Sequence, residues 1–106
     1  MPKYLVAVSY TAEGARGVAQ EGGSGRLAAA RALVESVGGT LESLHFAFGD
    51  ADLFAIADIP TASDAAAMAL AVSSSGAATA RTTVLLTVEE MDEAAGRAAS
   101  YRAPGT

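Results

Sequence analysis

His45 is the single histidine of this 106-residue chain and is the first candidate for proton transfer. It falls in the middle of a predicted strand, residues 40–48, between Ser43 and Ala47 on one face. Imidazole titrates near neutral pH, so in a cavity wall this side chain would act as a general base or orient a ligand. The alternative is a strand histidine that is satisfied or partly exposed and has no chemical role.

Arg81 and Tyr10 are the candidate ligand-binding residues beside His45. Arg81 lies in a predicted strand, residues 79–87, and a guanidinium facing an apolar cavity can hold an anion through two parallel hydrogen bonds. It can equally extend along the sheet edge or bridge to a partner subunit. Tyr10 ends the strand 3–10, where its polar tip would reach a pocket mouth. These residues predict a small apolar or anionic ligand.

Two aspartates stand at the predicted hairpin turn Gly49–Ala51: Asp50 lies within it and Asp52 follows it directly. Paired carboxylates can bind a hard cation or perform acid–base catalysis. At this spacing they more often hydrogen-bond the backbone of the turn itself. Both interpretations stay open, and Asp52 joins His45 as a catalytic candidate.

The segment Gly22–Gly25 precedes Arg26 in a way that superficially resembles an anion-binding helix entrance. It lacks the lysine and spacing of a phosphate loop and does not match the dinucleotide fingerprint. We interpret it as a flexible connector, with Ser24 as the N-cap of the helix that follows. Arg26 and Arg31 are then expected on a solvent-exposed helix face.

Composition excludes several classes of site. The chain has no cysteine and one histidine, which argues against disulfides and zinc sites, and no metal or cofactor is predicted. The net charge is −5 and the seven basic residues are scattered, so nucleic-acid binding is not expected. No apolar stretch reaches the roughly 20 residues of a membrane span, and the N-terminal apolar run is too short for a signal peptide. We therefore expect a cytoplasmic protein.

Apolar periodicity, capping residues and glycine breaks predict the secondary structure. The expected elements are strand 3–10, a short helix 12–19, helix 26–37, strand 40–48, strand 52–59, helix 62–72, strand 79–87 and helix 89–100. Thr61 and Thr87 are the predicted N-caps of the last two helices. Strict alternation in strand 40–48 places Leu41 on the face of His45 and Leu44 on the other. Residues 1–106 form one domain, with a fraying tail at 101–106.

This order of elements predicts a ferredoxin-like βαββαβ fold of the α+β class, followed by an extra helix. Both main helices would cover one face of a four-stranded antiparallel sheet. The first and third strands, however, carry apolar side chains on both faces, including Leu5 and Ala7 on the face left bare. An apolar face of this kind needs a cover, and a second copy across a two-fold axis is the simplest one. The sequence therefore predicts a homodimer, or a higher oligomer, that encloses an apolar cavity on the sheet side.

Several segments resemble the GYD-domain family when they are taken together. They are the opening Pro2–Gly14, the helix 26–37 with the following Gly38–Ser43, the segment Phe48–Asp52, the ending Asp58–Pro60 and the run 76–87. The resemblance extends to about Met91 and implies a ferredoxin-like fold of the dimeric α/β-barrel kind. Asp52 is the aspartate that matches the family pattern, but the resemblance implies no activity. Ala51 stands where the family tends to carry an aromatic residue, so any pocket that used that ring is altered here.

Three functions are compatible with these observations. The first is a small-molecule-binding or accessory module, in which a homodimer encloses an apolar cavity with His45, Arg81 and Tyr10 at its polar points. The second is a cofactor-independent oxygenase or isomerase acting on a hydrophobic or aromatic substrate, which rests on analogy of fold alone. The third is a scaffold whose bare sheet face binds another protein. Whether the chain is an enzyme stays open.

Overall fold

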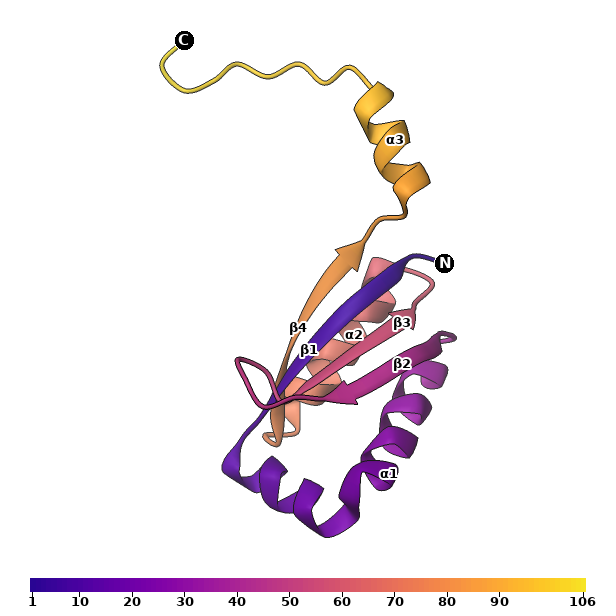
Figure 1. Cartoon of the computed structure of the whole chain (residues 1–106), viewed down its shortest axis with the longest axis vertical. Coiled ribbons are helices and arrows are strands. Elements are labelled where there is room, and N and C mark those ends of the chain that lie inside the picture. Colours follow the sequence, from indigo (N-terminus) through magenta and orange to yellow (C-terminus); the bar gives the residue numbers. More distant parts are fainter.

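The computed structural model describes residues 1–106 and consists of a sheet with helices against it and a helix extending beyond it (Figure 1). The elements are β1 (Lys3–Tyr10), α1 (Ala12–Ser36), β2 (Thr40–Phe46), β3 (Leu53–Asp58), α2 (Ala62–Ser74), β4 (Ala78–Leu85) and α3 (Val88–Gly96). The predicted α+β class is confirmed. No helix is both long enough and apolar enough to cross a bilayer.

The four strands form one open antiparallel sheet in the order β2-β3-β1-β4. β1 lies in the interior and pairs with β3 on one side and β4 on the other. β2 and β3 form the predicted hairpin, and β2 and β4 are the two edges. Each interior residue therefore has a direct neighbour on both sides, which aligns side chains in rows across the sheet.

The hydrophobic core lies between one face of the sheet and the two long helices. Its buried cluster joins sheet and helix residues, namely Tyr4, Val34, Ala57, Ile59, Ala65 and Met68. Only 12 of 106 residues are buried, because the second face of the sheet is uncovered and α3 packs on nothing. A core of this size leaves much apolar surface in contact with water.

The predicted break at Gly22–Gly25 is wrong in extent. α1 runs through this segment, and only Gly22 leaves helical geometry, with φ 74° and ψ 175°. A left-handed φ of this kind is accessible to glycine at little cost. The result is a kink between two helical halves (Figure 1), and Ser24 lies inside the helix instead of capping it.

The predicted alternation in β2 is also wrong. The register slips between Leu41 and Ser43, so one extra residue is inserted there. Leu41 is opposite Ala57 and packs against the core, while Ser43 and His45 lie on the uncovered face. A bulge reverses the side-chain phase of the residues before it, which strict alternation cannot anticipate.

The predicted N-caps of the last two helices are confirmed. The Thr61 hydroxyl accepts a hydrogen bond from the Asp64 backbone N–H at 3.1 Å, and Thr87 forms a complete capping box with Glu90. α3 nevertheless ends earlier than the predicted residue 100. It projects past the end of β4, away from the sheet (Figure 1), and none of its residues is buried.

Candidate functional site

The uncovered face of the sheet carries one row of side chains that spans all four strands. His45 is opposite Phe54, Phe54 is opposite Ala7, and Ala7 is opposite Arg81. Leu5 and Ile56 form the centre of the neighbouring row. Phe54 is 40% exposed although it lies in an interior strand. We call this surface the open face.

The open face has a charged border at one end. The Nζ atom of Lys3 lies 2.7 Å from Oε1 of Glu42 and 3.3 Å from Oδ1 of Asp58. The hydrogen bond to Glu42 raises the pKa of Lys3, desolvation opposes it, and Asp58 adds to the rise. This border frames the apolar centre formed by Leu5 and Ile56.

The structure does not bring the predicted ligand-binding residues together. His45 and Arg81 are both exposed, on the two edge strands, three strand spacings apart, or about 14 Å. At that separation they cannot contact the same small group within one protomer. Tyr10 lies on the opposite face, where it lines a pocket under the helices.

Asp52 connects two strands. Its Oδ2 atom accepts a hydrogen bond from the Tyr10 backbone N–H at 2.8 Å, and its own N–H donates to the Val8 carbonyl at 2.8 Å. The carboxylate therefore bonds to the end of β1 and not to its own turn. Asp50, by contrast, is exposed.

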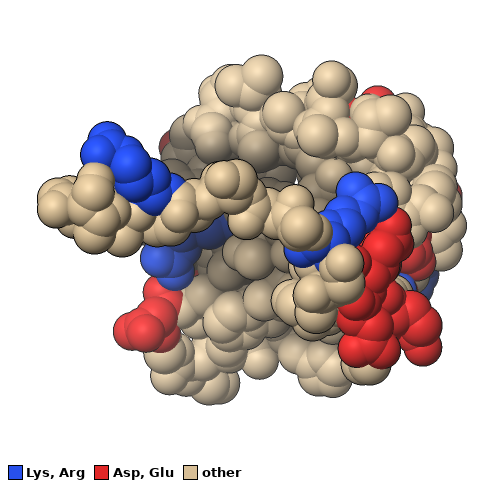
Figure 2. Space-filling view, turned by 90° about the horizontal axis from the view of Figure 1, so that it is seen from above, with Lys and Arg blue, Asp and Glu red and all other residues tan.

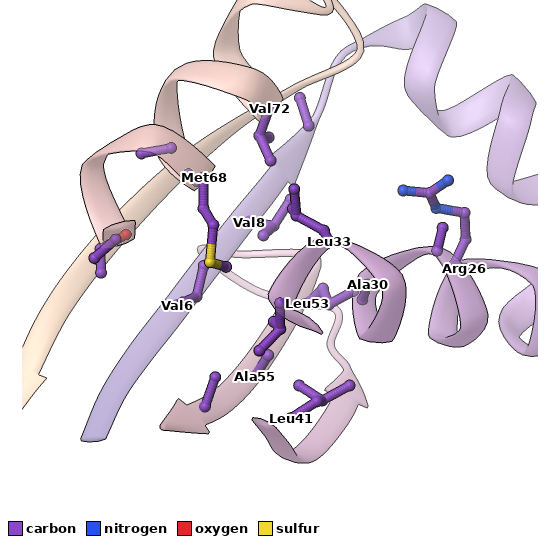
Figure 3. A pocket seen from close by; sticks show the side chains of 18 of the residues that line it. Val6, Val8, Arg26, Ala30, Leu33, Leu41, Leu53, Ala55, Met68 and Val72 are labelled. Carbon is purple, nitrogen blue, oxygen red and sulfur yellow. The ribbon is translucent and has the colours of Figure 1, made fainter. Parts of the chain in front are cut away.

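A pocket lies on the covered face of the sheet, in the gap between α1 and α2 (Figure 3). Its volume is about 110 Å³, and 18 of its 20 lining residues are hydrophobic, including Tyr10 with its hydroxyl; the other two are Arg26 and Thr82. Val6 and Val8 of β1 form its floor, with Leu33 and Met68 on the helices above. We call this cavity the helix-side pocket.

Arg26 stands at one end of the helix-side pocket (Figure 3), so the prediction of a solvent-exposed Arg26 is wrong. Its side chain is 34% exposed, and its Nε atom is buried with no hydrogen-bond partner. Nη1 lies 3.2 Å from Oε2 of Glu21. Burial works to lower the pKa of Arg26, but the Tyr10 hydroxyl and Glu21 outweigh it and raise that pKa.

The sequence contained a signal for this position. Arg26 precedes Ala30 by four residues and Leu33 by seven, which places all three on one helical stripe. Ala30 and Leu33 both line the pocket. A second stripe is formed by Leu27, Ala30 and Val34, which are spaced by three and four residues. Arg26 lies off that stripe, which is why the sequence predicts a solvent-exposed Arg26.

The family model of the GYD domain matches residues 4–95. The chain belongs to the GYD family. This match confirms the predicted resemblance. It covers nearly the whole sheet, both long helices and most of α3. No curated protein and no solved structure matches the chain.

The family position at Ala51 is buried in this GYD protein. Ala51 is 1% exposed and precedes Leu53 on the covered side of β3. An aromatic side chain there would need room that its neighbours now fill.

Charged residues are few on this GYD protein and gather in small groups. The view onto its α3 end shows the largest group of Asp and Glu at the right and a smaller one at the lower left, with most of the visible surface uncharged (Figure 2). α3 contributes acidic residues to its first turn, Glu89 and Glu90. Three polar features adjoin large apolar surfaces: the charged border at Lys3, the row that contains His45 and Arg81, and Arg26 at the helix-side pocket.

Proposed function

We propose that this GYD protein is a homodimeric small-molecule-binding or accessory module. In this proposal β1 to β4 with α1 and α2 form a ferredoxin-like unit, and two units pair sheet to sheet as in dimeric α/β barrels. The observation that carries it is the open face, where Phe54, Ile56 and Leu5 form an apolar centre that no element of the chain covers. Burial of this surface is the driving force for association.

The size of the open face limits how such a dimer is built. Four strands of 6 to 8 residues span an area of about 440 Å² at ordinary strand spacings. A standard stable interface buries about 800 Å² on each partner. Side chains give the open face more accessible surface than this flat area, and a second contact surface would bring the interface to the standard size.

α3 supplies that second surface in the proposal. It is nine residues long, and an isolated helix of this length is marginal in water. Val88 and Met91 are exposed on it, three residues apart, and Leu86 is exposed just before it. Because α3 projects away from its own sheet, we place it against the second copy, with Val88 and Met91 toward that copy.

The proposed dimer encloses an apolar cavity between the two open faces. His45 and Arg81 lie on the edge strands, so they would stand at the rim of this cavity. From the rim they can interact with polar groups of a bound molecule or of the partner subunit. Tyr10 is no part of this cavity, since it lines the helix-side pocket.

Sedimentation velocity at micromolar concentration tests the proposal. We expect a dimer for the native chain and a monomer for Phe54→Lys, because a lysine in the centre of the interface places an unpaired charge there. Leu70→Lys is the matched control: Leu70 is 70% exposed on α2 and lies outside the interface, so this variant should stay dimeric. Met91→Lys should weaken the dimer without abolishing the fold.

Circular dichroism of each variant separates loss of association from loss of folding. A native chain that sediments as a monomer at every concentration would overturn the proposed dimer. A dimer that Phe54→Lys and Leu70→Lys leave equally intact would place the interface elsewhere.

A further inference from the structure

We propose that the helix-side pocket binds a small apolar carboxylate, with the apolar body between α1 and α2 and the carboxylate on Arg26. The inference deepens the proposed small-molecule-binding function and rests on it for biological context. Its site is different, however, since it lies on the covered face of the sheet within a single protomer.

The lining of the pocket selects an apolar body. Val6, Val8, Leu33 and Met68 come from three different elements and face the same space (Figure 3). Of the two lining residues that are not hydrophobic, Thr82 is uncharged and belongs to the edge strand β4. A sugar, a nucleotide or a polyanion would leave most of its polar groups without partners, and burying such groups is costly.

The size of the pocket limits the ligand. A dry apolar cavity of about 150 Å³ is known to hold a benzene ring. The helix-side pocket, at about 110 Å³, is on the same scale. It therefore fits one ring or an alkyl chain of about six carbons, and is too small for a long fatty acid in full.

Arg26 determines the charge of the ligand. Its Nε–H is buried and donates to nothing, while Nη1 is engaged by Glu21. A buried donor without an acceptor is unfavourable, and a ligand oxygen would remove that cost. The guanidinium can offer two parallel N–H groups to a carboxylate and keeps its charge at every physiological pH. Glu21 already balances part of this charge, so a monoanion is the best match.

Tyr10 completes the polar end of the pocket. It lines the pocket together with Arg26, and its interaction with the guanidinium helps to raise the pKa of Arg26. Its position at the end of β1 is fixed by the bond from its backbone N–H to Asp52. The phenol thereby gives the carboxylate a second possible donor beside the arginine.

An NMR titration of the full chain with hexanoate, and with neutral hexanamide as its uncharged analogue, tests the inference. We expect hexanoate to shift the methyl signals of Val8, Leu33 and Met68. Hexanamide should shift the same signals at higher concentration. Charge-assisted hydrogen bonds imply that Arg26→Gln weakens hexanoate binding by about tenfold to a hundredfold, and leaves hexanamide nearly unchanged.

Two further variants control this experiment. Arg31→Gln removes the same charge from an exposed position of α1 and should bind hexanoate as the native chain does. Ala30→Leu places bulk in the pocket and should weaken both ligands. Unchanged hexanoate binding in Arg26→Gln, or shifts confined to the open-face residues Leu5 and Ile56, would overturn the assignment.

The result is separable from the fate of the proposed dimer. Phe54→Lys should bind hexanoate as the native chain does, because residue 54 points away from the pocket. A monomeric native chain that binds hexanoate at the pocket methyls would retain this inference and remove the dimer. A dimer whose pocket methyls do not move with hexanoate would do the reverse.

Discussion

The carboxylate of Asp52 accepts a hydrogen bond from the backbone N–H of Tyr10, with 2.8 Å between Oδ2 and N. The bond joins the entry of β3 to the end of β1, across 42 residues of sequence. It also holds the residue that shares the polar end of the helix-side pocket with Arg26. The aspartate that the sequence offered as a catalytic candidate thus has a positioning role in this structure.

Replacing Asp52 with Ala should destabilise the fold by about 1.5–3 kcal/mol, the usual range for a hydrogen bond to a charged group. Urea denaturation followed by circular dichroism measures this change. Asp50→Ala is the matched control, because Asp50 is exposed in the same loop, and it should change the free energy of unfolding by less than about 0.5 kcal/mol. Equal effects of the two substitutions would contradict the positioning role of Asp52.

Gly14 and Gly17 lie one turn apart in α1 and should respond to alanine in opposite ways. A Cβ at Gly14 would collide with the Ala77 carbonyl, so Gly14→Ala should cost about 1–3 kcal/mol of stability. A Cβ at Gly17 meets nothing within 4 Å, and Gly17→Ala should stabilise the helix by about 0.4–1 kcal/mol. Thermal unfolding of both variants checks the signs, and a stable Gly14→Ala would mean that α1 does not approach Ala77, the residue before β4, this closely.

The charged border of the open face predicts a pH effect. The pKa of Lys3 is raised above 10.5 in the folded chain by Glu42, against desolvation and with help from Asp58. The stabilisation is therefore fully present below pH 10.5 and is lost as the pH rises through the folded pKa. The stability difference between the native chain and Lys3→Gln should shrink above pH 10.5, as measured by urea midpoints. A difference that grows in that range would show that Lys3 is not paired.

The sequence alone was sufficient for the elements whose signals are local. β1 was located to the residue, and the N-caps Thr61 and Thr87 were identified, because alternation and capping act over a few neighbouring positions. The kink at Gly22 was located too broadly, since any of the nearby glycines has the freedom to break a helix. The bulge before Ser43 left no local trace, because it depends on pairing with β3.

The candidate site was harder to predict than the fold. His45 and Arg81 were correctly placed on one face, but their separation depends on the strand order, which puts them on opposite edges. The position of Arg26 in the pocket lining was not predicted, because it depends on the gap between α1 and α2 above the sheet. Spacing within one helix identifies a stripe of residues, but it does not reveal the cavity that the stripe adjoins.

The distance between two spin labels across the proposed dimer tests the central claim most directly. The chain has no cysteine, so Thr83→Cys on the open face and Ala66→Cys at an exposed position of α2 each give a single labelled position. Facing sheets pack about 10 Å apart, so continuous-wave electron paramagnetic resonance, which detects such short separations, should show dipolar broadening for the pair at residue 83. Double electron–electron resonance, which measures longer distances, should give a longer separation for the pair at residue 66. No dipolar coupling at either position, or a shorter separation at residue 66, would contradict dimerisation through the open face.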